Sequence, residues 1–162
     1  MRKLSLIAAV PLCLVTFALT EGYVQNNYRI YHNARFSYSI AYPVDILIPQ
    51  GEAANGDGQK FLSRDGRTEM LVYGSNNSLD QTIKQVYEEE ITGSSEHQAR
   101  VVTYKVLRTD WFVVSGIENG RIFYHKTMLR SGIFKTFQIE YDESEKQVFN
   151  PIAAKIAASF RG

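Results

Sequence analysis

The sequence predicts an α+β fold, an α/β/α sandwich in which helices cover an antiparallel β-sheet. Strand-like runs follow one another across short turns, and short turns imply antiparallel neighbours. Two other segments repeat their apolar residues at helical spacing. Aromatic residues make up 12% of the chain, which favours pleated surfaces over a helix bundle. The expected order of elements is β-β-β-α-β-β-β-β-α.

Three strands are predicted in the first half of the chain. Residues 36–43 alternate large apolar side chains with small ones and stop at a proline, as a half-buried strand does. A polar, glycine-rich passage from Gly51 to Gly58 follows. Residues 60–63 and 69–74 are the next strands, joined by a turn at Asp65-Gly66. We expect these strands to form one group of three.

A first helix is predicted from about residue 79 to residue 91. Ser78 can cap its start, and Gln81 three positions later can reach back to the cap as in a capping box. The face that meets the sheet is expected from the apolar residues at helical spacing, which are Leu79, Ile83, Val86, Tyr87 and Ile91.

Four more strands are predicted at residues 100–107, 111–118, 121–129 and 133–141. The turn at Asn119-Gly120 is the clearest, because both central residues of a type I′ turn need positive φ.

A terminal helix should then begin with Asn150 as its cap and Pro151 in its first turn. Its apolar stripe should pack on the sheet and consists of Phe149, Ile152, Ile156 and Phe160 beside Ala153 and Ala157.

The first twenty residues have the three parts of a cleavable export signal. A basic start is followed by an apolar run over residues 4–19, and small residues mark the exit. The run is shorter than the roughly 20 residues that span a bilayer. Cleavage after Ala18 and cleavage after Thr20 both fit. We expect a signal peptide at 1–20, an N-terminal lead-in at 21–35, and a single domain at 36–162 that works in the periplasm or as a secreted protein.

Signal removal would change the chemistry of the mature chain. Cys13 is the sole cysteine, so the mature chain would hold no thiol. Pro11 and Leu12 precede it instead of the small residues of a lipidation site. Loss of Arg2 and Lys3 would move the formal charge from +1 to −1. A nearly neutral chain gives no overall attraction for nucleic acid or anionic lipid.

No catalytic or cofactor motif is present in the sequence. Ser115 lacks the glycine two positions before it that a nucleophile elbow requires. No glycine-rich phosphate loop opens a helix. The three histidines, His32, His97 and His125, do not have the spacing of a helical zinc site. We expect no catalytic residue, no metal site and no cofactor.

A ligand or partner surface is predicted at Trp111, Asp110 and His125. Trp111 follows the turn at Asp110, where a strand end meets solvent, and aromatic rings are favoured at recognition surfaces. His125 lies on a predicted strand, on the same face as Phe123 and Thr127.

A weak cation-binding loop is the second candidate site. Asn55 and Asp57 alternate as at the start of a calcium loop, and Asp65 is a further oxygen donor. The twelfth position of such a loop falls on Gly66, so the bidentate ligand is missing. A plain turn is the alternative interpretation, because Asn and Asp bond their own backbone in turns.

Several segments, together with the element order, carry a family resemblance. They are FSYSIAYP at 36–43, the stretch with Gly56, Asp57, Gly58 and Phe61, TYK at 103–105, WFVVSG at 111–116 and residues 152–160. The chain resembles the PsbP-like, Mog-type α/β/α sandwich class of small secreted bacterial proteins over essentially all of its mature length. Relatives in this class include an extrinsic photosystem subunit, a Ran-binding protein, envelope proteins and secretion chaperones. The resemblance implies binding and assembly work, and it assigns no functional residue.

The sequence therefore favours a non-enzymatic periplasmic or secreted domain that binds an envelope or secreted protein or a small ligand. We expect no nucleic-acid partner and no membrane span after signal cleavage. The alternative is a small extracytoplasmic hydrolase with a geometrically assembled site, for example a serine with His125 and Asp110. A structural envelope component is a third possibility and would show a flat surface with a contiguous apolar patch.

Overall fold

The computed structural model describes residues 27–92 and 100–162. Within them the elements are β1 (Tyr28–Asn33), β2 (Tyr38–Pro43), β3 (Leu47–Glu52), β4 (Gly58–Ser63), β5 (Glu69–Asn76), α1 (Ile83–Thr92), β6 (Arg100–Leu107), β7 (Trp111–Glu118), β8 (Arg121–Arg130), β9 (Ile133–Asp142), a 3₁₀ turn at Glu143–Glu145 and α2 (Lys146–Ser159). No helix among these residues is long and apolar enough to cross a membrane. The expected export signal and His97 lie outside the described residues.

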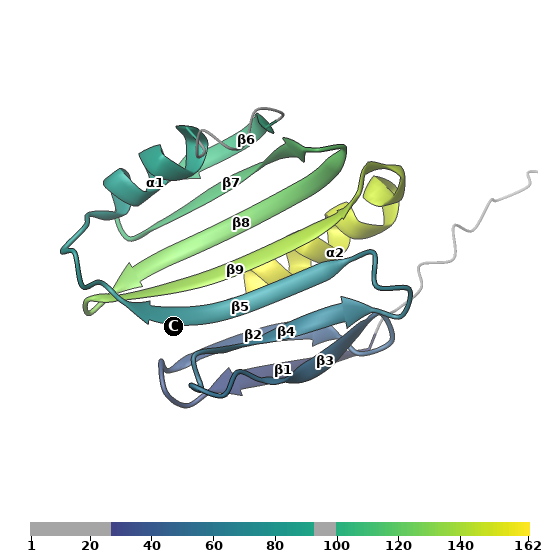
Figure 1. Cartoon of the computed structure of the whole chain (residues 1–162), viewed down its shortest axis with the longest axis horizontal. Coiled ribbons are helices and arrows are strands. Elements are labelled where there is room, and N and C mark those ends of the chain that lie inside the picture. Colours follow the sequence, from purple (N-terminus) through teal and green to yellow (C-terminus); the bar gives the residue numbers. More distant parts are fainter. Residues whose placement is uncertain (1–26, 93–99) are drawn as a thin grey trace, which may run out of the picture.

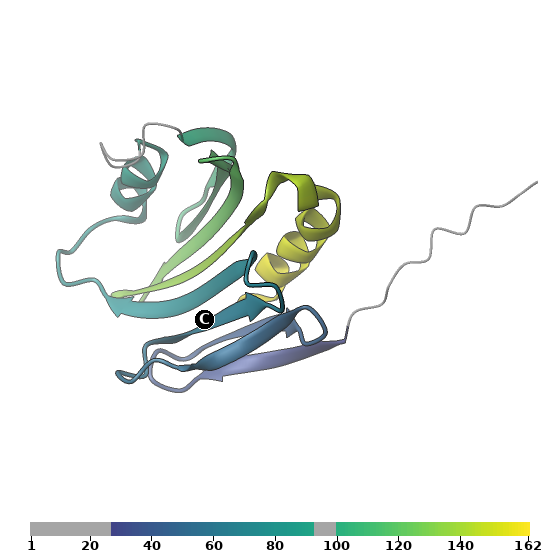
Figure 2. The ribbon, with the colours of Figure 1, turned by 45° about the vertical axis from the view of Figure 1, so that its right-hand side comes forward.

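A seven-stranded antiparallel sheet forms the middle layer. Its strand order is β3-β4-β5-β9-β8-β7-β6, and β1 pairs with β2 in a separate two-stranded ribbon. Helix α1 packs on one face, against β6 and β7, while α2 packs on the other face with the ribbon strand β2 beside it. Figure 2 shows the curved sheet between these layers. The predicted α+β sandwich is confirmed.

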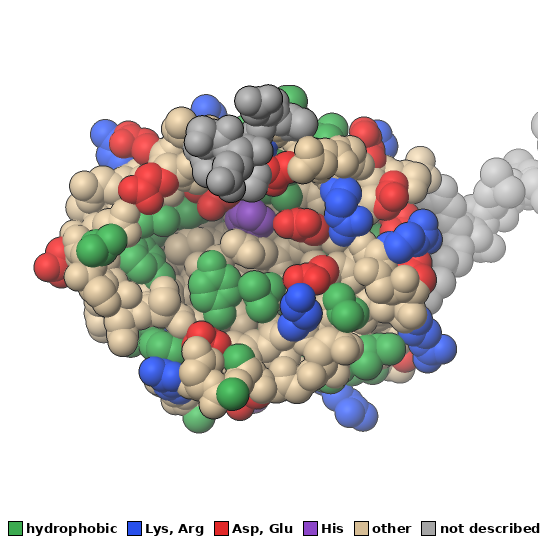
Figure 3. Space-filling model, viewed as in Figure 1, with side chains coloured by type: hydrophobic (Ala, Val, Ile, Leu, Met, Phe, Trp, Pro, Cys, Tyr) green, Lys and Arg blue, Asp and Glu red, His purple; other side chains and the backbone are tan. Residues whose placement is uncertain are grey.

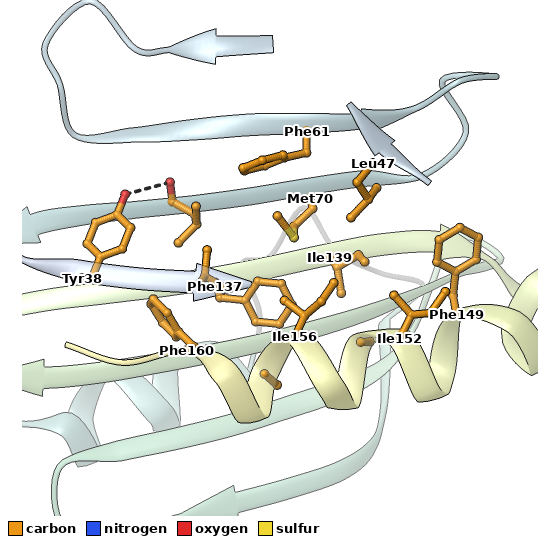
Figure 4. Close-up of a cluster of buried hydrophobic side chains, with 14 of the residues drawn as sticks. Tyr38, Leu47, Phe61, Met70, Phe137, Ile139, Phe149, Ile152, Ile156 and Phe160 are labelled. Carbon is orange, nitrogen blue, oxygen red and sulfur yellow. Dashed lines mark hydrogen bonds between the residues drawn. The ribbon is translucent and has the colours of Figure 1, made fainter. Parts of the chain in front are cut away.

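The main core lies between the sheet, α2 and the ribbon. The predicted stripe of α2 points into it, and Ile156 is completely buried there against sheet residues such as Phe137 and Ile139 (Figure 4). A smaller cluster of Ile83, Phe112, Val114 and Phe123 lies under α1. The two helices therefore cover two separate cores on opposite faces of one sheet.

The first strands pair differently from the prediction. Residues 36–43 and the next two strands were expected to form one group. In the structure β2 pairs with β1 in the separate two-stranded ribbon and is not part of the large sheet. Strands β1 and β3 were not predicted. Pro49 and Gly51 interrupt β3, which is tolerated because β3 is an edge strand of the large sheet. The turn at Asn119-Gly120 has the expected positive φ at both residues.

Both predicted helix starts are wrong. Asp80 has a φ of 49°, which prevents the helix from running through it, and Leu79 is 80% exposed. Helix α1 begins at Ile83, and the capping box is formed by Thr82 and Gln85. The Gln85 amide donates to Thr82 Oγ1 at 3.3 Å, and the Thr82 amide donates to Gln85 Oε1 at 2.8 Å.

Helix α2 begins at Lys146 and contains Pro151 in its interior. Asp142 starts this segment by accepting the Ser144 amide at 3.0 Å, and the 3₁₀ turn continues into the helix. Asn150, the predicted cap, instead accepts a hydrogen bond from the Tyr141 hydroxyl at 2.7 Å. The apolar stripe was predicted correctly although the start of the helix was not.

Candidate binding surface

The three residues predicted as one ligand surface lie on two faces of the sheet. Trp111 is paired with Met128, which belongs to the main core on the α2 side. His125 is paired with Val114, which lies in the cluster under α1. Trp111 and Asp110 therefore lie near α2, whereas His125 faces α1, and they cannot contact one ligand together.

Cations surround Trp111 at the start of β7. The Arg108 guanidinium lies 5.8 Å and the Lys126 ammonium 5.5 Å from the centre of its ring, within the range of a cation–π interaction. Asp110 accepts a hydrogen bond from Arg130 Nε at 3.0 Å. We call Arg108, Asp110, Trp111, Lys126, Arg130 and Arg161 the Trp111 cluster. It joins the β6–β7 turn, β8 and the segment after α2.

Lys126 is the central cation of the Trp111 cluster. Strand alternation places it on the core-facing side of β8, so its ammonium emerges at the C-terminal end of α2 and donates to the Ala157 carbonyl at 2.7 Å. Burial, and then the charges of Arg161 and Arg130, lower its pKa. Arg161 donates to the Ala158 and Phe160 carbonyls at the same helix end. Cations are favoured there because the last helical carbonyls are unpaired and negative.

Positive charge in the Trp111 cluster is only partly neutralised. Among the residues that the structure describes, Arg130 has Asp110 as its ion-pair partner, while Arg108, Lys126 and Arg161 have no carboxylate within 4.0 Å. Lys135 lies nearby, donates to the Ser37 carbonyl at 3.2 Å, and has a pKa lowered by burial and by Arg130. This end of the domain therefore has a local excess of positive charge despite the nearly neutral whole.

His125 forms a different site with Glu90 and Arg100. His125 Nδ1 lies 2.9 Å from Glu90 Oε1, and Arg100 donates to the same oxygen. Burial alone would raise the pKa of Glu90, but hydrogen bonds and charges from His125 and then Arg100 outweigh it and lower the pKa to about 2. The Arg100 guanidinium also lies over the Phe123 ring, with its carbon 4.1 Å from the ring centre. The trio ties α1 to β6 and β8.

The chemistry available to His125 is limited in the described part of the chain. With Nδ1 donating to Glu90, the buried Nε2 has no hydrogen-bond partner there, and so no serine hydroxyl reaches it. Asp110 belongs to the other face, so the triad considered for a hydrolase does not form. The face around α1 is hollowed, with a histidine and mixed apolar and charged side chains visible (Figure 3).

The predicted cation loop has its residues at two ends of β4. The side-chain amide of Asn55 donates a hydrogen bond from Nδ2 to Asp57 Oδ2 at 2.7 Å in the β3–β4 loop. Asp65 lies in the β4–β5 turn and accepts from Ser63 at 2.6 Å and from Arg67 at 2.7 Å. These hydrogen bonds are those of turns, and they hold the Asp65 pKa below its ordinary value. Within residues 27–92 and 100–162, no group of three or more histidine or acidic residues is placed to hold a metal ion.

Sequence reasoning did not single out Lys126 or Glu90. A signal existed for each. Lys126 alternates with Tyr124 and Met128, so it is a lysine at an inward position of a strand. Glu90 is seven residues after Ile83 and therefore shares the apolar face of its helix. A charged residue on a buried face needs a partner, and here those partners define both sites.

Comparison with known proteins rests on structure alone, because no family model and no curated protein matches this sequence. The solution structure of cyanobacterial PsbP (CyanoP) from Synechocystis sp. PCC 6803 matches 90% of this chain and 98% of its own, with a TM-score of 0.63. The fold is that of PsbP. Sequence identity is 14%, so this PsbP-like chain shares the architecture and no residue role is transferred from the cyanobacterial protein.

Proposed function

We propose that this PsbP-like domain is a non-enzymatic binding domain that works in the periplasm or as a secreted protein and helps to assemble a protein complex. The predicted export signal supports the location, and the PsbP fold is compatible with an accessory role. The observation that carries the proposal is the Trp111 cluster, where a half-buried tryptophan is surrounded by cations that lack acidic partners among the described residues.

The partner that fits the Trp111 cluster is a protein surface rich in Asp and Glu. Trp and Arg are enriched among the residues that dominate binding energy, and complementary charge speeds encounter and excludes wrong partners. The cations come from three separate segments and spread over an open end of the domain, which suits a protein surface better than a small ligand. An acidic partner would also relieve the mutual repulsion of Lys126, Arg130 and Arg161.

Charge reversal tests this proposal. We would tag the full chain, recover it with its partners from the native cell envelope, and compare wild type with the double variant Arg108→Glu and Arg161→Glu. The matched control is Arg64→Glu, since Arg64 is exposed in the β4–β5 turn at the opposite end of the sheet. Wild type and control should retain one specific acidic partner, and the double variant should lose it while still folded, with a somewhat lower melting temperature because Arg161 no longer caps the end of α2. Equal recovery by all three proteins, or recovery of no specific partner, would contradict the proposal.

A hydrolase is the second candidate, and the Glu90–His125 hydrogen bond is the observation that favours it. An orienting carboxylate on Nδ1 is what a general-base histidine requires. A nucleophile within reach of Nε2 is also required, and the described residues supply none. Labelling by a fluorophosphonate probe that disappears in His125→Gln, with the fold intact, would establish this function. We expect no labelling.

A further inference from the structure

A groove on the α2 side of the sheet adjoins the Trp111 cluster: Tyr124 lines the groove, and Lys126 of the cluster is the next residue on the same face of β8. Its volume is about 360 Å³, and its floor is formed by β6, β7 and β8. Tyr104, Ile117 and Ile122 line this floor with Tyr124, while the start of α2 forms the wall with Lys146. The lining of the groove combines these aromatic and aliphatic side chains with the polar residues Thr103, Ser115, Glu143, Lys146 and Asn150, and binding sites commonly join an apolar surface to polar groups in this way.

The open side of the groove is the edge strand β6. Among the described residues β6 pairs only with β7, so one side of its backbone has no strand neighbour. Val101 is 59% and Tyr104 54% exposed, and their pairing with Ile117 and Ser115 places both on the face of the groove. A long edge with exposed apolar side chains is a template for another strand.

The two edges of the sheet differ in how they are protected. Strand β3 contains Pro49, which has no N–H to donate, and Gly51, whose φ is 96°. Strand β6 contains neither residue type, and three of its eight residues are Val, which suits a pleated strand. A bulge near Thr103 is its single irregularity. Both edges therefore carry features that discourage pairing, but β3 contains a residue that cannot donate, whereas β6, with Lys105 and one bulge, keeps all of its backbone N–H groups.

We infer that β6 and the adjacent groove bind an extended, uncharged segment of a partner protein, which adds to the sheet as an eighth strand. The unpaired backbone of β6 specifies an extended chain, because only a strand can satisfy a row of N–H and C=O groups. Every second side chain of that segment would face the groove. Glu143 and Lys146 at its rim lie 3.9 Å apart and neutralise each other, so an apolar or aromatic side chain is the complementary one.

The tyrosines of the groove support the same choice. Burial, and then the neighbouring Tyr124, raise the pKa of Tyr141 to about 12, and burial with the neighbouring Tyr104 raises that of Tyr124. Both hydroxyls are neutral at physiological pH, as that of an ordinary tyrosine also is. The Tyr141 hydroxyl is already used by Asn150 at 2.7 Å. The groove presents aromatic rings to an incoming side chain, and rings favour apolar and aromatic contacts.

The test uses a panel of fluorescein-labelled peptides of sequence Thr-X-Thr-X-Thr-Lys, in which each X is Phe, Tyr, Leu or Val. Binding to the full domain is measured by fluorescence anisotropy, and hydrogen exchange reports protection of the β6 amides. The matched control peptide replaces the central Thr with Pro, which removes a backbone donor. The variant is Val101→Asp with Tyr104→Asp, and its control is Ile30→Asp, at a position 61% exposed on β1.

We expect at least one peptide of the panel to bind wild type and Ile30→Asp equally and to slow exchange along β6. The double variant should bind at least tenfold more weakly with an unchanged melting temperature, and the proline peptide should not bind. Arg108→Glu should leave peptide binding unchanged, which separates this site from the Trp111 cluster. Absence of binding across the panel, equal binding of the proline peptide, or protection of β6 by self-association without peptide would overturn the inference.

Discussion

Replacing Glu90 by Gln should destabilise the domain, and the free energy of unfolding of this variant should change less with pH in the acid range than that of wild type. The Glu90 pKa falls from an ordinary 4.5 to about 2 in the folded protein. Because one pKa unit corresponds to about 1.4 kcal/mol, the charged carboxylate contributes up to about 3 kcal/mol to the free energy of unfolding. The Glu90 side chain is 21% exposed, so solvent screens this interaction only weakly. Gln keeps the size of the side chain but leaves Arg100, which is 9% exposed, without its charge partner.

The pH dependence follows from the direction of the shift. A folded pKa below the unfolded value means that the stabilisation is complete above about pH 4.5 and is lost as the pH falls toward 2. Urea unfolding at pH 7, 5 and 3 should therefore show that the difference in free energy of unfolding between wild type and Glu90→Gln becomes smaller as the pH falls. The control is Glu88→Gln, whose exposed ion pair with Lys84 is worth about 0.5 kcal/mol or less. Equal stability of Glu90→Gln and wild type at pH 7 would refute this reasoning.

Three further predictions concern the core, the helix cap and the export signal. Ile156→Asp should unfold the domain or cost several kcal/mol, because it places an unpaired charge at a fully buried position; an unchanged melting temperature would contradict the packing of α2. Thr82→Ala should lower the free energy of unfolding by about 1 kcal/mol, because it removes the cap of α1, and Ser78→Ala should lower it by only a few tenths. A larger loss in Ser78→Ala than in Thr82→Ala would instead identify Ser78 as the cap. N-terminal sequencing of the exported protein should begin at Leu19 or at Glu21, whereas an intact Met1 would refute cleavage.

The spacing of apolar residues predicted most of the fold, because it indicates which side of a helix or strand is buried. The apolar stripe of α2 and the strands β6 to β9 follow directly from it. Helix starts were missed because they depend on single dihedral angles and local hydrogen bonds. Asp80 in a left-handed conformation moves the start of α1 to Thr82, and no pattern of apolar residues contains that information. Strand β1 was missed because few of its side chains are buried.

The sites were less predictable because they depend on contacts between distant segments. Asp110 and Trp111 were named from sequence, but their cationic neighbours come from β8 and from the end of the chain. His125 was grouped with them by composition, although strand alternation places it on the opposite face. Glu90 and Arg100 meet His125 only after α1 folds onto the sheet. Sequence alone thus named the residue types and did not assign their partners.

Site-specific photocrosslinking in native cell envelopes tests the role of the Trp111 cluster most directly. A photoreactive phenylalanine analogue would replace Thr109, which is exposed between Arg108 and Asp110, and Arg64 would be the control position. We predict a crosslink from position 109 to a protein with an acidic contact surface, weakened as salt rises from 0.1 to 1 M and the screening length falls from about 10 to about 3 Å. Position 64 should give none. An equal crosslink from both positions, or one insensitive to salt, would contradict docking of an acidic partner at this surface.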